Sequence, residues 1–453
     1  LNITRIRNTH LDIYHIDHCA TFYYWYMENN EEQITMKITV IGAGIIGVTS
    51  AYFLAKDGYE VEVIERQDGP ALETSFANAG MLTPSMADPW NSPRIFGTLI
   101  ASLASSHSSF KLRPKALPSM IGWGLSFLNH SRKKHYYKNL HRSADLSCYS
   151  MEILAGLNEE LDIQYDGYET GSMKVFRDPE AMNELAKLSE HLKDHAMTFQ
   201  VLKGEEITKV EPSLKAVEHQ LCGGVYFPGD HAGNAYLFTC EMEKQARNLG
   251  VNFRYGVTVN KMVRSGSKIS KLITSEGELT SDLFILCGGS YSMPLARTAN
   301  LNVPVRPAKG YSLTVPLNGW NGGPRMPLID DGFHAAISPL GDVLRVAGTA
   351  EFAGYDQSLN RNRLDKLYNL VDEIYPQFKP YLDRDKVTEW AGLRPLTVDG
   401  SPYIGKTEIE NLHLNTGHGP LGWTMAAGSS KMLSDIVKGE KTVLDESTYS
   451  LNR

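Results

Sequence analysis

Hydrophobic positions follow two different periods along this chain. Residues 37–41 (KITVI) and 59–64 (YEVEVI) are short β-branched runs, which indicate buried parallel strands. Between them, residues 48–58 (VTSAYFLAKDG) predict a helix that ends at a glycine. Apolar and polar residues alternate at three later places, as they do in antiparallel strands: 171–177, 309–316 and 333–346. The pattern therefore predicts a parallel α/β part and a second part with an antiparallel sheet.

A glycine-rich turn, GAGIIG, joins the first strand to the helix, and Glu65 follows the second strand. This order of strand, GxGxxG, helix, strand and acid is the fingerprint of dinucleotide binding. Gly42 permits the tight turn, Gly44 lets the backbone approach a pyrophosphate, and Gly47 lets the helix pack on the strand. The helix N-terminus attracts the phosphates. Glu65 accepts hydrogen bonds from ribose hydroxyls and would repel a 2′-phosphate, which disfavours NADP.

Segments of small residues further along favour FAD over NAD. Residues 73–82 (ETSFANAGML) suit a loop that lies along a flat ring system. A strand at 283–290 ends in a glycine pair, and a strand at 412–415 runs into the glycine-rich start of another helix. That helix N-terminus would stabilise the negative charge of a reduced flavin. The residues expected at the cofactor are Ile41, Gly42, Ala43, Gly44, Ile45, Ile46, Gly47, Glu65, Arg66, Ser75, Asn78, Ala79, Gly80, Gly288, Gly289, Gly417, Gly419, Leu421 and Gly422.

Length, composition and charge exclude several classes of protein. The chain has 453 residues, of which 42% are hydrophobic and 21% charged, as in a globular protein of two domains. Its net charge of −7 gives no overall attraction to nucleic acid, so we expect no such partner. The five scattered cysteines lack CxxC spacing, which indicates free thiols in a reducing compartment and no metal site. No apolar run is long enough to cross a membrane.

Residues 1–35 do not have the pattern of a folded segment. They carry an aromatic cluster at 22–26 and no signal-peptide pattern, and Met36 leads directly into the first strand. We interpret them as a disordered or non-native extension. The alternative is an N-terminal arm packed on the surface.

Several motifs together resemble the D-amino acid dehydrogenase (small subunit) family, within the group of glycine, sarcosine and D-amino acid oxidases. They are MKITVIGAGIIGVTSAYFL, ALETSFANAG, GYSLT, GLRP and NTGHGPLGWTMA, and the resemblance runs from residue 36 to about 439. It implies oxidative deamination of D-amino acids to 2-oxo acids and ammonia, with electrons passed to a quinone or another respiratory acceptor. It also implies noncovalent FAD, which the lack of cysteine in 329–347 fits. Finally, it implies that Val259 lies against the adenine; an ordinary sheet strand is the alternative.

The fold class expected is α/β: a discontinuous Rossmann-type FAD-binding domain on a mostly parallel sheet, plus an α+β substrate domain with a mixed or antiparallel sheet. We assign 36–84, 232–295 and 390–438 to the FAD-binding domain, and 146–229 and 303–380 to the substrate or cap domain. Residues 85–145 form a helical insertion. Its apolar groups are followed by Arg132, Lys133, Lys134, Lys138 and Arg142, as in a helix at a membrane surface. Two helices with a solvated basic face fit the pattern equally well.

Oxidation of an amino acid by a flavin mainly requires that the substrate be positioned, with its Cα–H aimed at flavin N5. Arg394 in GLRP is the candidate for binding the substrate carboxylate, in agreement with the resemblance. Its alternative role is an ion pair with Asp399. Tyr311 is a second candidate at the substrate, or else an aromatic of the sheet. His418 is expected at the flavin edge or against backbone.

These features lead to a main hypothesis and two others. The main one is a D-amino acid dehydrogenase for D-alanine-like substrates, located in the cytoplasm or peripherally on the inner face of the plasma membrane. The second is a glycine- or sarcosine-type oxidase that uses oxygen. The third is a flavin-binding protein without turnover, which would have no need of a carboxylate-binding arginine.

Overall fold

The computed structural model of the protein describes residues 35–93, 110–113 and 117–453. Residues 37–453 form one compact unit. The extension expected at 1–35 lies almost entirely outside the described residues, as does part of the expected helical insertion.

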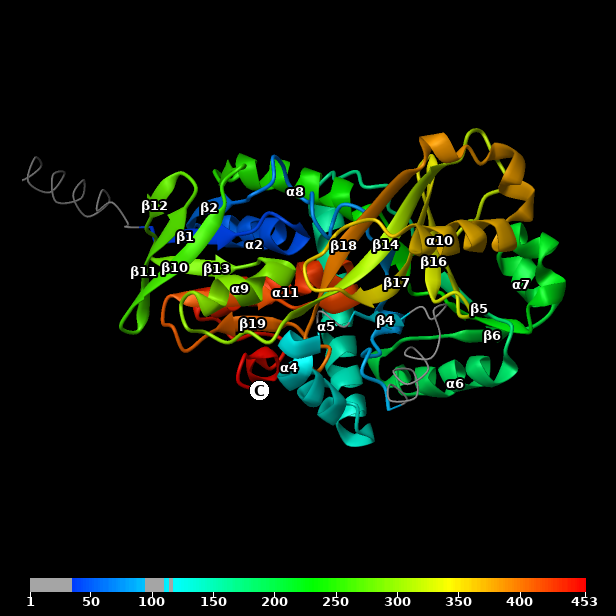
Figure 1. Ribbon diagram of the computed structural model, residues 1–453, viewed down its shortest axis with the longest axis horizontal. Coiled ribbons are helices and arrows are strands. Elements are labelled where there is room, and N and C mark those ends of the chain that lie inside the picture. The colour runs from blue at the N-terminus through cyan, green and yellow to red at the C-terminus, as the bar shows by residue number, and fades with distance from the viewer. Residues whose placement is uncertain (1–34, 94–109, 114–116) are drawn as a thin grey trace, which may run out of the picture. The chain divides into compact units, whose positions relative to one another are not determined.

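One half of this unit is built on a six-stranded sheet (Figure 1). Its strands, in spatial order, are β19 (Tyr403–Lys406), β20 (Leu412–Thr416), β13 (Leu283–Leu286), β1 (Lys37–Ile41), β2 (Glu60–Ile64) and β9 (Asn252–Arg254). All neighbours are parallel except β19 and β20. In the register, Ile41 lies beside both Ile64 and Leu286, so the carboxyl ends of the central strands meet at one edge.

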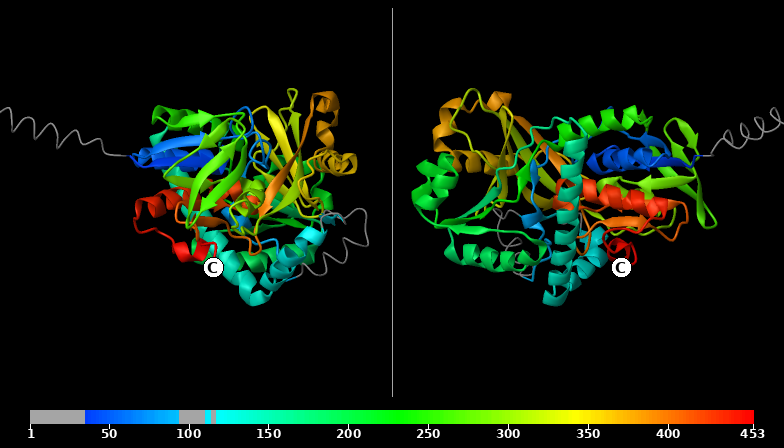
Figure 2. Two further views of the ribbon diagram at one scale, coloured as in Figure 1. Left: turned by 60° about the vertical axis from the view of Figure 1, so that its left-hand side comes forward. Right: turned by 180° about the vertical axis from the view of Figure 1, so that it is seen from behind.

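Helices cover one face of this sheet. The helices α2 (Ile45–Lys56) and α11 (Gly422–Lys438) pack on its strands. In turn, α8 (Ala235–Asn248) packs against α2 and α5 (Lys133–Glu160) against α11, and the view from behind in Figure 2 shows α2, α11 and α5 on the near side. The other face carries the short helix α9 (Ser292–Arg297) and a three-stranded sheet of β10 (Val259–Ser265), β11 (Lys268–Thr274) and β12 (Gly277–Leu279). Asn234 begins α8 because its side chain accepts hydrogen bonds from the amides of Tyr236 and Leu237.

The other half is built on a nine-stranded mixed sheet. Its main path is β18 (Thr388–Leu396), β14 (Arg306–Pro316), β17 (Val343–Phe352), β16 (Ala335–Leu340), β15 (Leu328–Asp330), β5 (Ser172–Phe176), β7 (Gly223–Phe227) and β6 (Gln200–Leu202), with β4 (Phe110–Leu112) beside β17. Only the pairs β15–β5 and β17–β4 are parallel. Three helices accompany the sheet: α6 (Pro179–Glu190), α7 (Glu205–Val210) and α10 (Arg361–Ile374).

Side chains alternate across β14, as the sequence predicts. Tyr311, Leu313 and Val315 belong to an apolar core that also contains residues of α10. Ser312 and Thr314 therefore lie on the opposite face of the sheet. The alternation at 333–346 belongs to two strands rather than one, because Gly341 takes φ = +56° in the turn between β16 and β17.

The remaining short elements connect these layers. They include the strand pair β3 (Met81–Leu82) and β8 (His231–Ala232); the 14-residue helix α4 (Leu117–His130) precedes α5. Helix α5 continues without a break through residue 145, where we expected a domain boundary. The α/β fold class with a mixed second sheet is confirmed, whereas the domain boundaries stay a prediction.

Helices α5 and α11 approach closely at one glycine. A Cβ on Gly428 would lie 2.7 Å from the Cα of Ser150, and the Gly428 amide donates a 2.9 Å hydrogen bond to the Ser150 hydroxyl. The substitution Gly428→Ala should therefore lower the free energy of unfolding by about 1–3 kcal/mol through overpacking, measured by urea unfolding. The control is Gly156→Ala on α5, where a Cβ meets nothing within 4 Å. That change should raise stability by about 0.5–1 kcal/mol; equal effects would contradict the packing argument.

Candidate FAD site and substrate arginine

A cavity of about 390 Å³ opens at the carboxyl ends of the central strands. Cavities of roughly 300–1,000 Å³ are typical of ligand sites, and ligands of open α/β sheets bind at this edge. Ile41, Ile64 and Thr416 line it from three strands, and Val257 and Tyr291 line it from the loops. The cavity thus lies where the glycine fingerprint predicts a dinucleotide.

The turn from β1 to α2 brings backbone atoms into direct contact. Gly42 has φ = +107°, and a Cβ there would lie 2.8 Å from the carbonyl oxygen of Cys287. A Cβ on Gly47 would lie 1.9 Å from the carbonyl oxygen of Gly42. Any larger residue would push the helix away from the strand. Gly44 borders the cavity, and a Cβ on it would have only the Ser75 hydroxyl nearby, at 3.5 Å.

Glu65 is held in place by backbone donors. Its two carboxylate oxygens accept hydrogen bonds from the amides of Ala43 (2.7 Å) and Gln67 (2.9 Å). Burial raises the pKa of Glu65, while these two donors favour the carboxylate. Each oxygen has a further lone pair, so the carboxylate can also accept from ribose hydroxyls.

Another part of the cavity lining, at β20 and the start of α11, has the features of a flavin-ring site. Asn415 is fully buried and lines the cavity, and its Oδ1 has no hydrogen-bond partner among the described residues. The 17-residue helix α11 begins beside it, without a side-chain cap or an acid in its first turn. A Cβ on Gly289 would meet nothing within 4 Å. An unpartnered buried amide oxygen, an uncapped helix N-terminus and open space over a glycine all fit FAD.

Arg394 lies at the end of β18, next to Pro395, which lines the cavity. Its Nη1 donates to the carbonyl oxygen of Thr349 at 3.0 Å, and its guanidinium lies 5.6 Å from the centre of the Trp90 ring. Burial lowers the pKa of Arg394 to about 10, so it is cationic at neutral pH. No carboxylate in the described part of the chain pairs with it.

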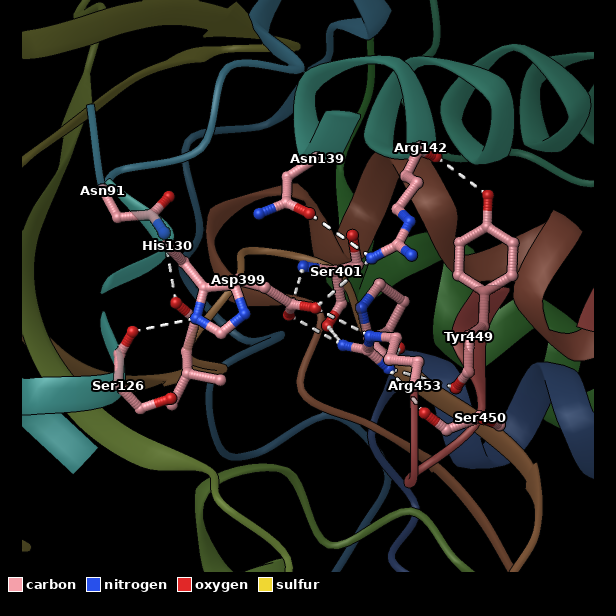
Figure 3. A network of polar contacts seen from close by, with 12 residues as sticks. Asn91, Ser126, His130, Asn139, Arg142, Asp399, Ser401, Tyr449, Ser450 and Arg453 are labelled. Atoms are coloured by element: carbon pink, nitrogen blue, oxygen red, sulfur yellow. Dashed lines mark hydrogen bonds and ion pairs between the residues drawn. The ribbon is translucent and has the colours of Figure 1, made fainter. Parts of the chain in front are cut away.

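Asp399, the partner considered for Arg394, is bound elsewhere (Figure 3). Arg453 contacts both carboxylate oxygens, with Nε at 2.7 Å and Nη2 at 2.8 Å, and Arg142 lies at 3.7 Å. Burial opposes the charged form of Asp399, but Arg453 outweighs it and lowers the pKa of this carboxyl. Asp399 therefore pairs with Arg453 and not with Arg394.

The other two predicted catalytic side chains are fully enclosed. The hydroxyl of Tyr311 donates a 2.7 Å hydrogen bond to Glu351, which also contacts Arg113, and Tyr311 belongs to the apolar core. His418 lines the cavity, and its Nε2 lies 3.0 Å from the hydroxyl of Ser429. Burial lowers the pKa of His418 to about 3, so its imidazole is neutral.

Comparison with known proteins agrees with this geometry. A family model described as FAD dependent oxidoreductase matches residues 37–436. The chain belongs to this family. The D-amino acid dehydrogenase of Allorhizobium ampelinum is 41% identical over 418 residues, which cover 92% of this chain and 98% of that protein. The D-amino acid dehydrogenase of Vibrio vulnificus (strain YJ016) is 37% identical over 407 residues, with 90% and 97% covered.

Solved structures show the same fold at lower identity. Glycine oxidase from Geobacillus kaustophilus has a TM-score of 0.71 at 21% identity, with 92% of this chain and 99% of that chain covered. L-proline dehydrogenase from P. horikoshii has a TM-score of 0.72 at 18% identity, with 92% and 97% covered. The resemblance to D-amino acid dehydrogenases is confirmed, as are FAD as the cofactor and an oxidoreductase activity.

Most residues expected at FAD line the cavity: Ile41, Gly42, Gly44, Ile45, Ile46, Glu65, Arg66, Ser75, Val259, Gly288, Gly289, Gly417, Gly419 and Gly422. Six others lie outside its lining: Ala43, Gly47, Asn78, Ala79, Gly80 and Leu421. Of these, Ala43 positions Glu65, and Gly47 packs on Gly42. The individual roles at the cofactor, and those of Arg394, Tyr311 and His418, stay predictions.

Tyr291 and Asn415 are among the cavity residues that sequence reasoning missed. Tyr291 stacks with Arg66, whose guanidinium lies 3.7 Å from the centre of its ring. Asn415 supplies the unpartnered oxygen. Tyr291 comes shortly after the glycine pair at 288–289, and Asn415 comes shortly before Gly417. This closeness to glycine-rich turns is the sequence signal that could have identified them. In the described part of the chain, no group of three or more His, Cys, Asp or Glu side chains is arranged to hold a metal ion.

The neutral state of His418 makes stability depend on pH. An unfolded histidine binds a proton near pH 6.5, whereas His418 resists protonation down to about pH 3. Lowering the pH from 7 to 5 should therefore reduce the free energy of unfolding by about 2 kcal/mol through this residue alone, because only the unfolded state takes up the proton. His418→Gln should lose that part of the pH dependence in urea unfolding. An unchanged slope would contradict a buried neutral imidazole.

Proposed function

We propose that this protein oxidises D-amino acids of the D-alanine type to 2-oxo acids and ammonia. The observation that carries the proposal is Arg394 beside the FAD cavity, a largely buried guanidinium that has no carboxylate partner among the described residues. A buried charge of this kind is costly unless a ligand compensates it. The α-carboxylate of an amino acid matches the guanidinium fork in charge and geometry.

The residues of the chain then divide the work of the reaction. Arg394 binds the carboxylate, and Thr349 fixes Arg394 through its carbonyl oxygen. The fingerprint glycines and Glu65 hold FAD, which supplies the two-electron oxidant when bound. The substrate loses a hydride from Cα, and a proton from its nitrogen passes to solvent. Water then converts the resulting imine to the 2-oxo acid and ammonia. Neither His418 nor Tyr311 needs to move a proton in this scheme.

FAD is held without a covalent bond in this proposal. Among the described cysteines, Cys287 lines the cavity. Burial raises the pKa of its thiol to about 12, so the nucleophilic thiolate is scarce at neutral pH. The thiol is therefore poorly suited to attack the flavin.

The electron acceptor in this proposal is a quinone or another respiratory carrier. The curated relatives are named dehydrogenases, which supports this acceptor over oxygen. A glycine-type oxidase remains the alternative, because the fold of glycine oxidase is the same.

A peripheral contact with an anionic membrane surface fits α4 and the start of α5. Ile121 and Leu125 are 63% and 66% exposed and lie four residues apart on α4. Exposed basic side chains follow at Arg132, Lys133, Lys134 and Lys138. Arg142, which the sequence grouped with them, instead lies beside Asp399. In the described chain no helix is both long and apolar enough to cross a bilayer, and the proposed contact places the protein on the inner face of the plasma membrane.

Anaerobic bleaching of the bound flavin tests the substrate class. D-alanine should bleach the visible absorption, whereas L-alanine and sarcosine should not. Arg394→Met should raise the Kd of D-alanine by about 10- to 150-fold, because a charged hydrogen-bond donor is lost. Arg384→Met, an exposed arginine of the same half, serves as the control and should leave Kd unchanged. Bleaching by sarcosine would favour the oxidase reading, and bleaching by none of the three would contradict turnover of these substrates.

Vesicle co-sedimentation tests the membrane contact. The protein should bind phosphatidylglycerol vesicles more tightly than phosphatidylcholine vesicles, and less tightly as salt rises. The double substitution Ile121→Ser/Leu125→Ser should weaken binding by about tenfold or more, because two apolar side chains no longer insert. Val443→Ser removes an equally exposed apolar side chain elsewhere and should have no effect. The proposal would be contradicted if the double variant and the Val443→Ser control bound phosphatidylglycerol vesicles equally tightly.

A further inference from the structure

The mixed sheet has a polar face as well as its apolar core face. Thr314 and Ser338 stand directly opposite Arg345 on the two neighbouring strands. Directly opposed residues of antiparallel strands point to the same side. Ser312 lies two residues along β14 from Thr314 and shares that side. The row therefore carries one guanidinium and three hydroxyls on the face that is turned away from α10.

Arg345 on this face has no carboxylate partner in the described part of the chain. Its side chain is buried, with the residue 6% exposed. Its Nε donates to the Thr314 hydroxyl at 3.1 Å and its Nη1 to the carbonyl oxygen of Asn78 at 3.0 Å. Both acceptors are neutral. Burial lowers the pKa of Arg345 to about 10, which leaves it cationic at neutral pH without a counter-charge.

Unpartnered hydroxyls surround the same region. Ser312, Ser338 and Thr349 are all at least nine-tenths buried, and none of their hydroxyl oxygens has a hydrogen-bond partner within the described residues. Most buried hydroxyls in proteins are hydrogen-bonded. Ser338 and Ser312 lie near Arg345 and Thr349 contacts Arg394, so unpartnered hydroxyls accompany both guanidinium groups and indicate a ligand that carries hydrogen-bond acceptors.

The two uncompensated arginines are placed for one small ligand. Arg394 donates to the carbonyl oxygen of Thr349, which lies on the same strand as Arg345 and four residues further along. Four residues of strand correspond to about 13 Å between Cα atoms. The guanidinium of Arg394 is held at Thr349, at one end of that distance, and the Cα of Arg345 lies at the other. The long side chain of Arg345 shortens the span that a ligand between the two guanidinium groups must bridge, which suits a short dicarboxylate. Trp390 lies directly opposite Ser312 and adds an aromatic side chain to the same face.

We propose that Arg345, with Ser338 and Ser312, is a specificity-determining group that binds the side-chain carboxylate of an acidic D-amino acid. Arg394 binds the α-carboxylate of the same molecule. This inference rests on the proposed function, since it assumes that a D-amino acid is the substrate. It extends that function from D-alanine, which engages one arginine, to D-glutamate, which engages both.

Anaerobic flavin reduction with four substrates tests the inference: D-glutamate, D-glutamine, D-norleucine and D-alanine. D-glutamate should bind at least about tenfold more tightly than D-glutamine and D-norleucine, because only it matches the second charge. Arg345→Met should raise the Kd of D-glutamate by about 10- to 150-fold, whereas the Kd of D-alanine should change by no more than about twofold. Arg345→Lys keeps the positive charge without the guanidinium fork, so its affinity for D-glutamate should lie between those of the unmutated protein and Arg345→Met. Arg384→Met serves as the control and should alter neither substrate.

A second variant guards against loss of structure, because Arg345 also holds the loop at Asn78. Ser338→Ala removes an unpartnered hydroxyl and should leave FAD content and melting temperature unchanged. It should raise the Kd of D-glutamate by about 2- to 10-fold and leave the Kd of D-alanine unchanged. The inference is overturned if D-glutamate reduces the flavin no better than D-norleucine, or if Arg345→Met and Ser338→Ala affect D-glutamate and D-alanine equally. Failure of D-alanine itself to bleach the flavin would overturn the proposed function, and this inference with it.

Discussion

The contact of Gly47 with the carbonyl oxygen of Gly42 is the constraint on which the cofactor site depends. A Cβ at Gly47 would lie 1.9 Å from that oxygen, so only glycine allows α2 to start directly above β1. The start of α2 fixes where a pyrophosphate meets free amides, and it places the Ala43 amide on Glu65. Asn415 and Gly422, the first residue of α11, line the same cavity. The pyrophosphate part of the proposed FAD site is thus set by backbone contacts.

Charge pairing decides which arginines remain for a substrate. Arg453 lies against Asp399 with a bidentate contact and also donates to backbone carbonyls of residues 401, 402, 449 and 450. Because Asp399 is neutralised in this way, Arg394 keeps its charge for another anion. Arg345 is uncompensated for a different reason, since both of its acceptors are neutral. The proposed substrate binding follows from the lack of a carboxylate partner for these two guanidinium groups among the described residues.

Local signals in the sequence were sufficient for the α/β half. The glycine spacing and the two β-branched strands predict β1, α2, β2 and Glu65 because each of these features acts over a few residues. Contacts between distant segments were not predictable in the same way. The pairing of Arg453 with Asp399 joins residues 54 positions apart, and the polar row of Ser338, Arg345 and Thr314 depends on the register of three strands. Residues 333–346 show the same limit, because alternation alone does not reveal a turn at Gly341.

The rate of anaerobic flavin reduction by D-alanine that carries deuterium at Cα tests the central claim most directly. If Arg394 holds the carboxylate so that the Cα–H bond is broken in the oxidation, the deuterated substrate should bleach the flavin measurably more slowly than D-alanine, and L-alanine should not bleach it. Bleaching at the same rate for both isotopic forms, or by L-alanine as fast as by D-alanine, would contradict the account.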